Sequence, residues 1–411
     1  MSKDKTLIAK KEIYGTLRSC NFFIRRIGLS FVDKKPNTFL QKINVLSSFI
    51  TASSFVALML ISEYVYIVYL LAKSVTLEKL MGSYLHIAGY DTMSFGKLLT
   101  IWYKKNTFRR VVNDLADIWP VDEKNPEAVA IKNKCLSTLR SRQSLYIFWN
   151  VLGVWLYNLT PVALHLYRLA RGIPSDLGFV WQMYYPFDKT NPIVHEFVYI
   201  FETASGLYSV CCMLSSDVFF ITMASHISMM LRILQVKIRS LGVVESADGK
   251  LIGGLHNCYD EIIDLINVHQ RLIRYGNDLE DAFSVVNLIN VLLSSVNICC
   301  VMFSIIFLEP LMEMGNKFFI AAALTQMGVV CWYADDIYRA SVGVSDAVFA
   351  SGWYNCNPRC RRALLLMLQR SQRPLYFTAL KFSSITLNTF RSILTTSYSY
   401  FTLLYTSYRR H

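Results

Sequence analysis

The chain has 411 residues, of which 53% are hydrophobic and only 17% are charged, and its mean hydropathy is +0.33. A soluble chain would carry about 25% charged residues, and a disordered chain needs low hydrophobicity, so both classes are excluded. The net charge of +13 could indicate nucleic-acid binding. In so apolar a chain it is instead typical of basic cytoplasmic loops, and we expect no nucleic-acid partner. We predict a multi-pass membrane protein.

Seven stretches are apolar over roughly the 20 residues that a helix needs to cross a bilayer. In chain order they are 43–71, 80–103, 145–167, 197–234, 283–308, 318–333 and 375–405. The second stretch holds His86, Asp91 and Lys97, and ionisable residues at membrane depth tend to face a cavity or a partner. We interpret Asp91 and Lys97 as an interhelical pair or as the sign of a misplaced span edge. None of the three is assigned to a ligand pocket.

The positions of Lys and Arg predict the orientation. Thirty-one lie in the N-terminal segment or in the connections on its side, eight lie on the opposite side, and three lie within spans. Because cytoplasmic loops carry the excess of positive charge, we expect a cytoplasmic N-terminus and a short extracellular C-terminus. This orientation is the reverse of a G-protein-coupled receptor and disfavours a metabotropic seven-helix receptor.

Several connections predict helices longer than the bilayer is thick. After Pro192 no proline occurs before Gly242, and some 45 residues give roughly 68 Å of helix against a ~30 Å hydrocarbon core. The stretch that follows has an apolar face at helical spacing, including Leu255, Ile262 and Leu279. An amphipathic helix outside the membrane needs a packing partner. We expect a cytoplasmic helical bundle that holds subunits together; the alternative is ordinary loops with fraying helix ends.

The last span carries a stripe of hydroxyl groups opposite an apolar side. The stripe consists of Ser392, Thr395, Thr396, Ser399, Tyr400, Thr402, Thr406 and Ser407. Such hydroxyls either bond to neighbouring helices and to their own backbone, or line a water-filled path in which an apolar residue such as Leu403 forms a constriction.

The C-terminal region resembles the signature of insect odorant receptors. The matching residues are Ala347, Trp353, Tyr354, Arg370-Ser371-Gln372-Arg373-Pro374-Leu375, Thr378-Ala379, Lys381-Phe382, Leu387-Asn388-Thr389-Phe390, Ile393-Leu394 and Ser397-Tyr398-Ser399-Tyr400-Phe401. Gustatory receptors of the same superfamily end in Gln-Phe where this chain has Thr406-Ser407, so a gustatory-type channel subunit is the alternative. The short segment 242–254 leaves no room for the long insertion of the family's co-receptor. The chain is therefore similar to an odorant-tuning subunit.

The resemblance implies a ligand-gated, nonselective cation channel in the plasma membrane of olfactory neuron dendrites. It implies a heterotetramer with co-receptor subunits, joined through the cytoplasmic helices and surrounded by membrane lipid, with the last span of each subunit around a central pore. The residues then expected at the pore or its gate are Thr396, Ser399, Tyr400, Leu403 and Ser407. Family gates are usually apolar at the last of these positions, and Ser407 departs from that pattern.

The resemblance also divides the chain into six regions. These are a cytoplasmic N-terminal segment (1–42), four membrane helices whose extracellular half holds a ligand pocket (43–240), a cytoplasmic anchor extension (241–282), two further membrane helices (283–335), the cytoplasmic part of the seventh helix (336–374), and the pore-lining helix with a short tail (375–411). The predicted fold class is an all-α membrane protein with seven transmembrane helices and a cytoplasmic anchor bundle.

The expected ligand is a small volatile, bound mainly by shape and buried apolar area. In the third span Asn150, Gly153 and Tyr157 match the spacing of a family pocket stripe. Their depth in the membrane and the side of the helix that they occupy add six further pocket candidates: Tyr84, Ile87, Thr203, Tyr208, Phe318 and Ala322. The aromatic candidates favour an aromatic or heteroaromatic volatile. Each of them could instead pack against neighbours or anchor a helix at the interface.

No motif in the sequence indicates an enzyme, a cofactor or a metal site. His195-Glu196 is not followed by a second His at metalloprotease spacing, and no glycine-rich phosphate loop occurs. Cys356 and Cys360 form a lone CxxxC pair without a second ligand pair. We expect no catalytic residues.

Overall fold

The computed structural model describes residues 3–29, 38–75, 80, 84–173, 176–181, 183–189, 191–241, 259–307 and 314–408, and this part of the chain is mainly helical. The helices are α1 (Lys3–Thr16), α2 (Arg18–Arg26), α3 (Phe39–Ala72), α5 (His86–Ala116), α6 (Pro126–Ala170), α7 (Pro192–Arg239), α8 (Tyr259–Phe307), α9 (Met314–Ala350), α10 (Pro358–Ser371) and α11 (Leu387–Tyr408). A short 3-10 helix, η3 (Trp353–Asn355), precedes α10. Strands β1 (Thr378–Ala379) and β2 (Ser383–Ser384) pair antiparallel before α11.

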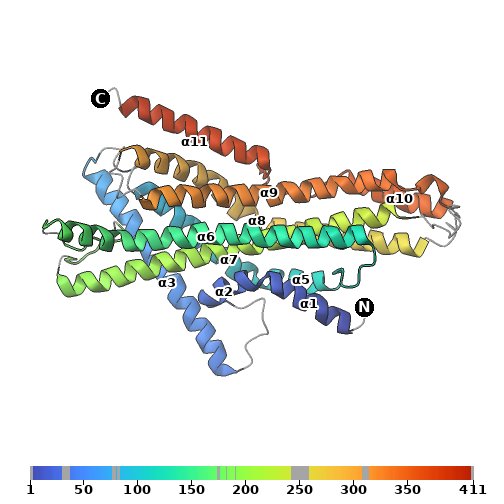
Figure 1. Ribbon diagram of the computed structural model, residues 1–411, viewed down its shortest axis with the longest axis horizontal. Coiled ribbons are helices and arrows are strands. Elements are labelled where there is room, and N and C mark those ends of the chain that lie inside the picture. The colour runs from blue at the N-terminus through green and yellow to red at the C-terminus, as the bar shows by residue number, and fades with distance from the viewer. Residues whose placement is uncertain are drawn as a thin grey trace.

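The long helices form an elongated bundle whose two ends differ. In Figure 1, α6, α7, α8 and α9 run along the long axis, with α10 and the N-terminus toward one end and the C-terminus at the other. The end with the N-terminus and α10 carries the basic connections and is the cytoplasmic end. Helix α3 crosses the bundle obliquely, and α11 diverges from α9 toward the C-terminus (Figure 1).

Five described helices are long and apolar enough to cross a membrane: α3, α6, α7, α8 and α9. The second and the last predicted spans correspond to α5 and α11, which are more polar. In α5 the polarity comes in part from His86, Asp91 and Lys97, whose side chains are all buried within the protein. In α11 it comes from hydroxyl groups. Length and apolar composition therefore detect the five apolar helices and do not detect the two in which polar groups are frequent.

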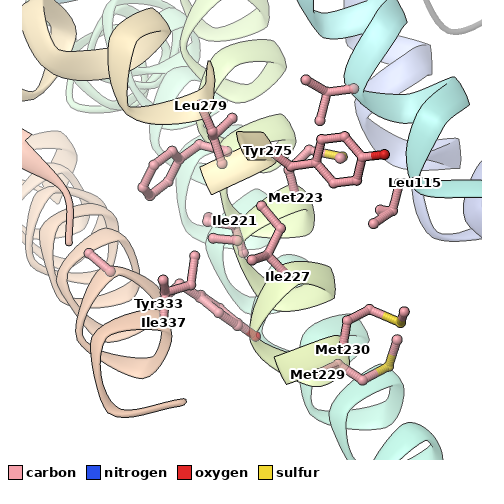
Figure 2. Packing of buried hydrophobic residues seen from close by; sticks show 14 of the residues in the cluster. Leu115, Ile221, Met223, Ile227, Met229, Met230, Tyr275, Leu279, Tyr333 and Ile337 are labelled. Atoms are coloured by element: carbon pink, nitrogen blue, oxygen red, sulfur yellow. The ribbon is translucent and has the colours of Figure 1, made fainter. Parts of the chain in front are cut away.

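Helix α7 forms the centre of the bundle. In its most apolar window 83% of the residues are buried, against 28% in α3, which turns residues such as Leu46 and Ile61 outward. Around α7 the core is continuous along the bundle. Figure 2 shows its middle, with labelled residues from α5 (Leu115), α7 (Ile221, Met223, Ile227, Met229, Met230), α8 (Tyr275, Leu279) and α9 (Tyr333, Ile337).

Three helices begin at the same dipeptide, Asn-Pro. The side chains of Asn125, Asn191 and Asn357 each accept a hydrogen bond from the backbone N–H two residues later, and proline fills the first helical position. Asparagine satisfies a donor that the helix leaves free, while proline has no N–H to satisfy, so the pair fixes where α6, α7 and α10 start. Each cap stabilises its helix by about 1 kcal/mol.

The last membrane helix starts later than its apolar content predicts. Residues 375–386 are not helical; they contain the β1–β2 hairpin, in which Leu380 and Lys381 have φ of 49° and 64°. Phe377 is buried, with its ring centroid 5.0 Å from that of Phe220 in α7. Leu375 and Phe377 at the start of the predicted span thus pack in the protein core, and hydropathy cannot distinguish that core from lipid.

The cytoplasmic end of the bundle is built from the first half of α8, the end of α9, η3 and α10. On α8, Ile262 and Leu279 are buried, as the amphipathic pattern predicts, while Leu255 and the segment 242–258 lie outside the described residues. Helix α10 packs on α8 and α9, yet Leu365 and Leu366 on its other side are 63% and 66% exposed. We call this part of the chain, 259–282 and 336–374, the anchor.

Candidate ligand-binding cavity and pore-facing helix

A small cavity of about 40 Å³ lies between α3, α5, α6, α7 and α9, away from the anchor. Its lining consists of Met59, Ile87, Tyr90, Asp91, Asn150, Gly153, Val154, Tyr157, Trp181, Gly206, Ser209, Val210, Phe319 and Ala322. The wall is mainly apolar and aromatic, with a few polar groups.

One face of α6 forms a continuous part of the wall. Asn150, Gly153 and Tyr157 are spaced three and four residues apart, so they stack along one side of the helix. The Asn150 side chain donates to the carbonyl of Tyr146 (2.9 Å), and its amide oxygen accepts from the Tyr90 hydroxyl (3.4 Å). A Cβ atom added at Gly153 would meet nothing within 4 Å. The space next to this glycine therefore belongs to the cavity.

The extracellular loop between α6 and α7 covers the cavity. We call its described residues, 176–181 and 183–189, the strap. Glu202 of α7 accepts hydrogen bonds from the backbone N–H groups of Val180 (2.7 Å) and Trp181 (3.0 Å) and from the Tyr185 hydroxyl (3.0 Å). The Trp181 indole N–H in turn donates to the Glu202 carbonyl (3.1 Å). One buried glutamate thus fixes the tryptophan that lines the cavity.

The structure brings five of the nine predicted pocket residues together around this cavity. Ile87, Asn150, Gly153, Tyr157 and Ala322 all line it. They come from α5, α6 and α9, so the stripe on α6 faces residues from two other helices.

The other four lie elsewhere. Tyr84 contacts Tyr66 with ring centroids 5.3 Å apart, and Tyr208 lies against Phe55. Phe318 lies against Trp149, and Thr203 is on α7 one turn before the cavity. For α9 the aromatic residue in the wall is Phe319, because adjacent helical positions point about 100° apart and depth alone does not choose between them.

Trp181 and Asp91 are cavity residues that the sequence interpretation missed. A loop position does not show in which direction a tryptophan side chain points. Glu202, a carboxylate at membrane depth, does indicate that nearby groups donate hydrogen bonds to it. The interpretation of Asp91 and Lys97 as a pair is wrong. Lys97 forms its ion pair with Asp217 of α7 at 2.7 Å, with both side chains buried, whereas Asp91 lines the cavity.

In the described part of the chain, one side of helix α11 packs on α8 and α9. The Ser397 hydroxyl donates to the Ser295 carbonyl (3.0 Å), and Phe401 is buried beside Cys299 and Phe303. On the opposite side Tyr400 and Leu403 are 58% and 65% exposed.

The other predicted pore residues lie along the same helix. Ser399 is exposed and Thr396 is half-buried. The Ser407 side chain lies outside the described residues. The described chain leaves this side of α11 uncovered, and several of its hydroxyls, including those of Thr395 and Ser399, bond back to the helix backbone.

The hairpin before α11 is tied to the anchor. The Glu280 carboxylate accepts hydrogen bonds from the Thr378 backbone N–H (2.9 Å) and from the Thr378 hydroxyl. Burial raises the pKa of Glu280, while these two hydrogen bonds act in the opposite direction. The contact fixes the start of α11 relative to α8.

Comparisons with known proteins agree with this architecture. The family model described as 7tm Odorant receptor matches residues 79–398. Odorant receptor 85b of Drosophila melanogaster is 25% identical over 330 residues, which cover 78% of this chain and 80% of that protein. Odorant receptor 22c of the same species is 29% identical over 260 residues, covering 61% and 63%.

A solved structure shares the fold. The insect olfactory receptor OR5 from Machilis hrabei, in complex with eugenol, superposes with a TM-score of 0.82 at 13% identity, covering 97% of this chain and 99% of that chain. A second structure of that receptor gives a TM-score of 0.78. Since the family model spans well over half of the sequence, the chain belongs to the 7tm odorant receptor family and is a multi-pass, all-α membrane protein.

Proposed function

We propose that the chain is the odorant-tuning subunit of a ligand-gated, nonselective cation channel in the plasma membrane. A small volatile binds in the cavity between α3, α5, α6, α7 and α9, and binding widens a pore formed by α11 together with co-receptor subunits. The observation that carries the proposal is the strap-covered aromatic cavity in a chain of the odorant receptor family. That family consists of receptors, not enzymes.

The cavity supports binding of a compact, largely apolar ligand. Its polar groups are few, and Gly153 leaves room that a larger side chain would fill. Affinity then comes mainly from apolar area removed from water, about 25 cal/mol per Å². The role of Asn150, Gly153, Tyr157, Ile87 and Ala322 is to shape this volume.

The uncovered surfaces support assembly. The exposed side of α11 combines hydroxyl groups with Leu403, which suits a water-filled path with an apolar constriction. In the anchor, Leu365 and Leu366 offer apolar area to a neighbouring subunit. We infer a heterotetramer with co-receptor subunits, joined by the anchor.

A ligand shifts the channel towards its open arrangement only if it binds that arrangement more tightly than the closed one. The test is two-electrode recording from oocytes that express the chain with and without a co-receptor, with a panel of volatiles that includes eugenol. We expect odorant-evoked current only with the co-receptor. Current without it would contradict the subunit assignment, and silence in both conditions across the panel would contradict the channel proposal.

The same recordings test the constriction. Leu403→Ala removes apolar bulk from the proposed gate, so we expect basal current to rise several-fold before any odorant is applied. Leu46→Ala, at an exposed leucine of α3 outside the anchor, is the control for general effects of losing a leucine. If Leu403→Ala leaves both basal current and odorant potency unchanged, Leu403 is not at the gate.

A further inference from the structure

Two buried carboxyl groups at the cavity have no role in the function proposed above. Asp91 lines the cavity and is 1% exposed, and Glu63 of α3 is 5% exposed. The two side chains lie close enough to interact directly, and Glu202 adds negative charge nearby. Buried carboxylates repel one another and require a cation, hydrogen-bond donors or a shared proton.

Among the described residues this pair has few donors, of which Ser209 hydrogen-bonds with Asp91. Both carboxyl oxygens of Glu63 and the Oδ2 atom of Asp91 have no hydrogen-bond partner among them. Glu202 differs, since it is satisfied by the strap. Lys97, the lysine of the same helix as Asp91, is paired with Asp217. The pair therefore offers unused acceptor capacity at the wall of a cavity.

Four aromatic rings surround the same space. Tyr157 has its ring centroid 5.0 Å from that of Trp181, and Phe319 lies 5.5 Å from Tyr90 and 6.4 Å from Tyr157. Aromatic faces attract cations within about 6 Å of the ring centroid. A carboxylate combined with several aromatic walls is the chemistry that recognises an ammonium group, through a charge-assisted hydrogen bond and cation–π contacts.

We propose that Asp91, supported by Glu63, makes the cavity selective for small amines with an apolar body. The amine binds in its protonated form and donates to the Asp91 carboxylate, while its apolar body occupies the space beside Gly153. One proton shared by Glu63 and Asp91 leaves a single negative charge, which matches the single positive charge of the ligand. The inference rests on the proposal that this cavity is the odorant site.

The test compares probes of nearly equal shape: benzylamine, benzyl alcohol and toluene, with the corresponding pentyl series. Concentration–response curves are recorded from cells that express the chain with the co-receptor. We expect the amines to be the most potent. Asp91→Asn should raise the half-maximal concentration for benzylamine by about tenfold or more and that for benzyl alcohol by less than about threefold. Asp91→Glu should keep the preference for the amine.

Two controls make the result specific. Glu196→Gln removes an exposed carboxylate of α7 outside the cavity and the strap, and we expect it to change neither curve. Surface labelling of an epitope tag shows whether each variant reaches the membrane. The comparison of amine, alcohol and hydrocarbon on the unaltered chain depends on no variant.

The proposal is overturned if the amines are no more potent than their neutral counterparts, or if Asp91→Asn weakens both classes equally. Gly153→Val then distinguishes a cavity that binds odorants without amine selectivity from a cavity that does not bind odorants. If that variant still weakens the response to neutral volatiles, the cavity remains the odorant site and only the amine selectivity fails. If it leaves every response unchanged, the proposed function of the cavity fails as well.

Discussion

At the scale of single residues, the buried Asp217 carboxylate connects α7 with three other helices. One of its carboxylate oxygens accepts hydrogen bonds from Lys97 of α5 (2.7 Å), Tyr146 of α6 (2.6 Å) and Gln326 of α9 (3.1 Å). A buried charge with this many donors is satisfied, but removing its cation leaves it uncompensated. Tyr146 is one helical turn from Asn150, so the network also supports the floor of the cavity.

Lys97→Met is therefore expected to destabilise the protein by about 3–5 kcal/mol, because it leaves the Asp217 carboxylate buried without a counter-charge. Thermal unfolding of the purified protein in detergent, with surface labelling in cells, measures the effect. The double variant Lys97→Met, Asp217→Asn removes both charges and should recover a large part of the loss. If the double variant is less stable than Lys97→Met alone, the ion pair is not the cause.

At the scale of elements, the strap depends on a single glutamate. Glu202→Ala removes the carboxylate, so the N–H groups of Val180 and Trp181, which donate to the same Oε2 atom, lose their acceptor. We expect hydrogen exchange at 180–185 to accelerate about tenfold and odorant potency to fall with it. Glu196→Ala, on the same helix but outside this network, serves as the control. Unchanged exchange at 180–185 would show that other contacts hold the strap.

The packing of α10 on α8 should respond to pH. Burial lowers the pKa of His269 to about 4, and the positive charge of Arg370 adds to the effect. The unfolded chain binds a proton near pH 6.5, whereas the folded chain does not until about pH 4. Stability is thus complete above pH 6.5 and falls by about 3 kcal/mol as pH decreases to 4.

Thermal unfolding of the detergent-solubilised protein between pH 7 and 4 measures this dependence. We expect His269→Gln to flatten the pH profile over that interval, while His165→Gln, at the opposite end of the bundle, should leave it unchanged. A profile that is identical in the unaltered chain and in His269→Gln would show that His269 does not titrate between these limits.

At the scale of the whole molecule, the sequence predicts the architecture well. The membrane class and five of the seven spans follow from hydropathy, and the family follows from the C-terminal motifs; α5 and α11 are too polar for length and apolar composition alone to detect. The residue at which α11 begins cannot be predicted from hydropathy, because Leu375 and Phe377 are apolar residues buried in the protein core. Hydropathy assigns them to lipid.

The cavity is only partly predictable for the same reason. The α6 stripe of Asn150, Gly153 and Tyr157 is recognisable because three residues at helical spacing define one face. Phe319 and Trp181 cannot be recognised as cavity residues, because a single aromatic residue does not show in which direction its side chain points. The partner of Lys97 is likewise invisible, because it lies on another helix and 120 positions away in the chain.

Ligand binding in this cavity is the step that we propose controls the current. Gly153→Val tests it most directly, because a Cβ atom at this position meets nothing within 4 Å and the added methyl groups occupy ligand space. Gly15→Val, at a helical glycine of α1 with equally open surroundings, is the matched control. Odorant concentration–response curves are recorded for both variants with the co-receptor. We predict that Gly153→Val raises the half-maximal concentration about tenfold or abolishes the response, while Gly15→Val does neither; equal curves for the two variants would contradict the claim.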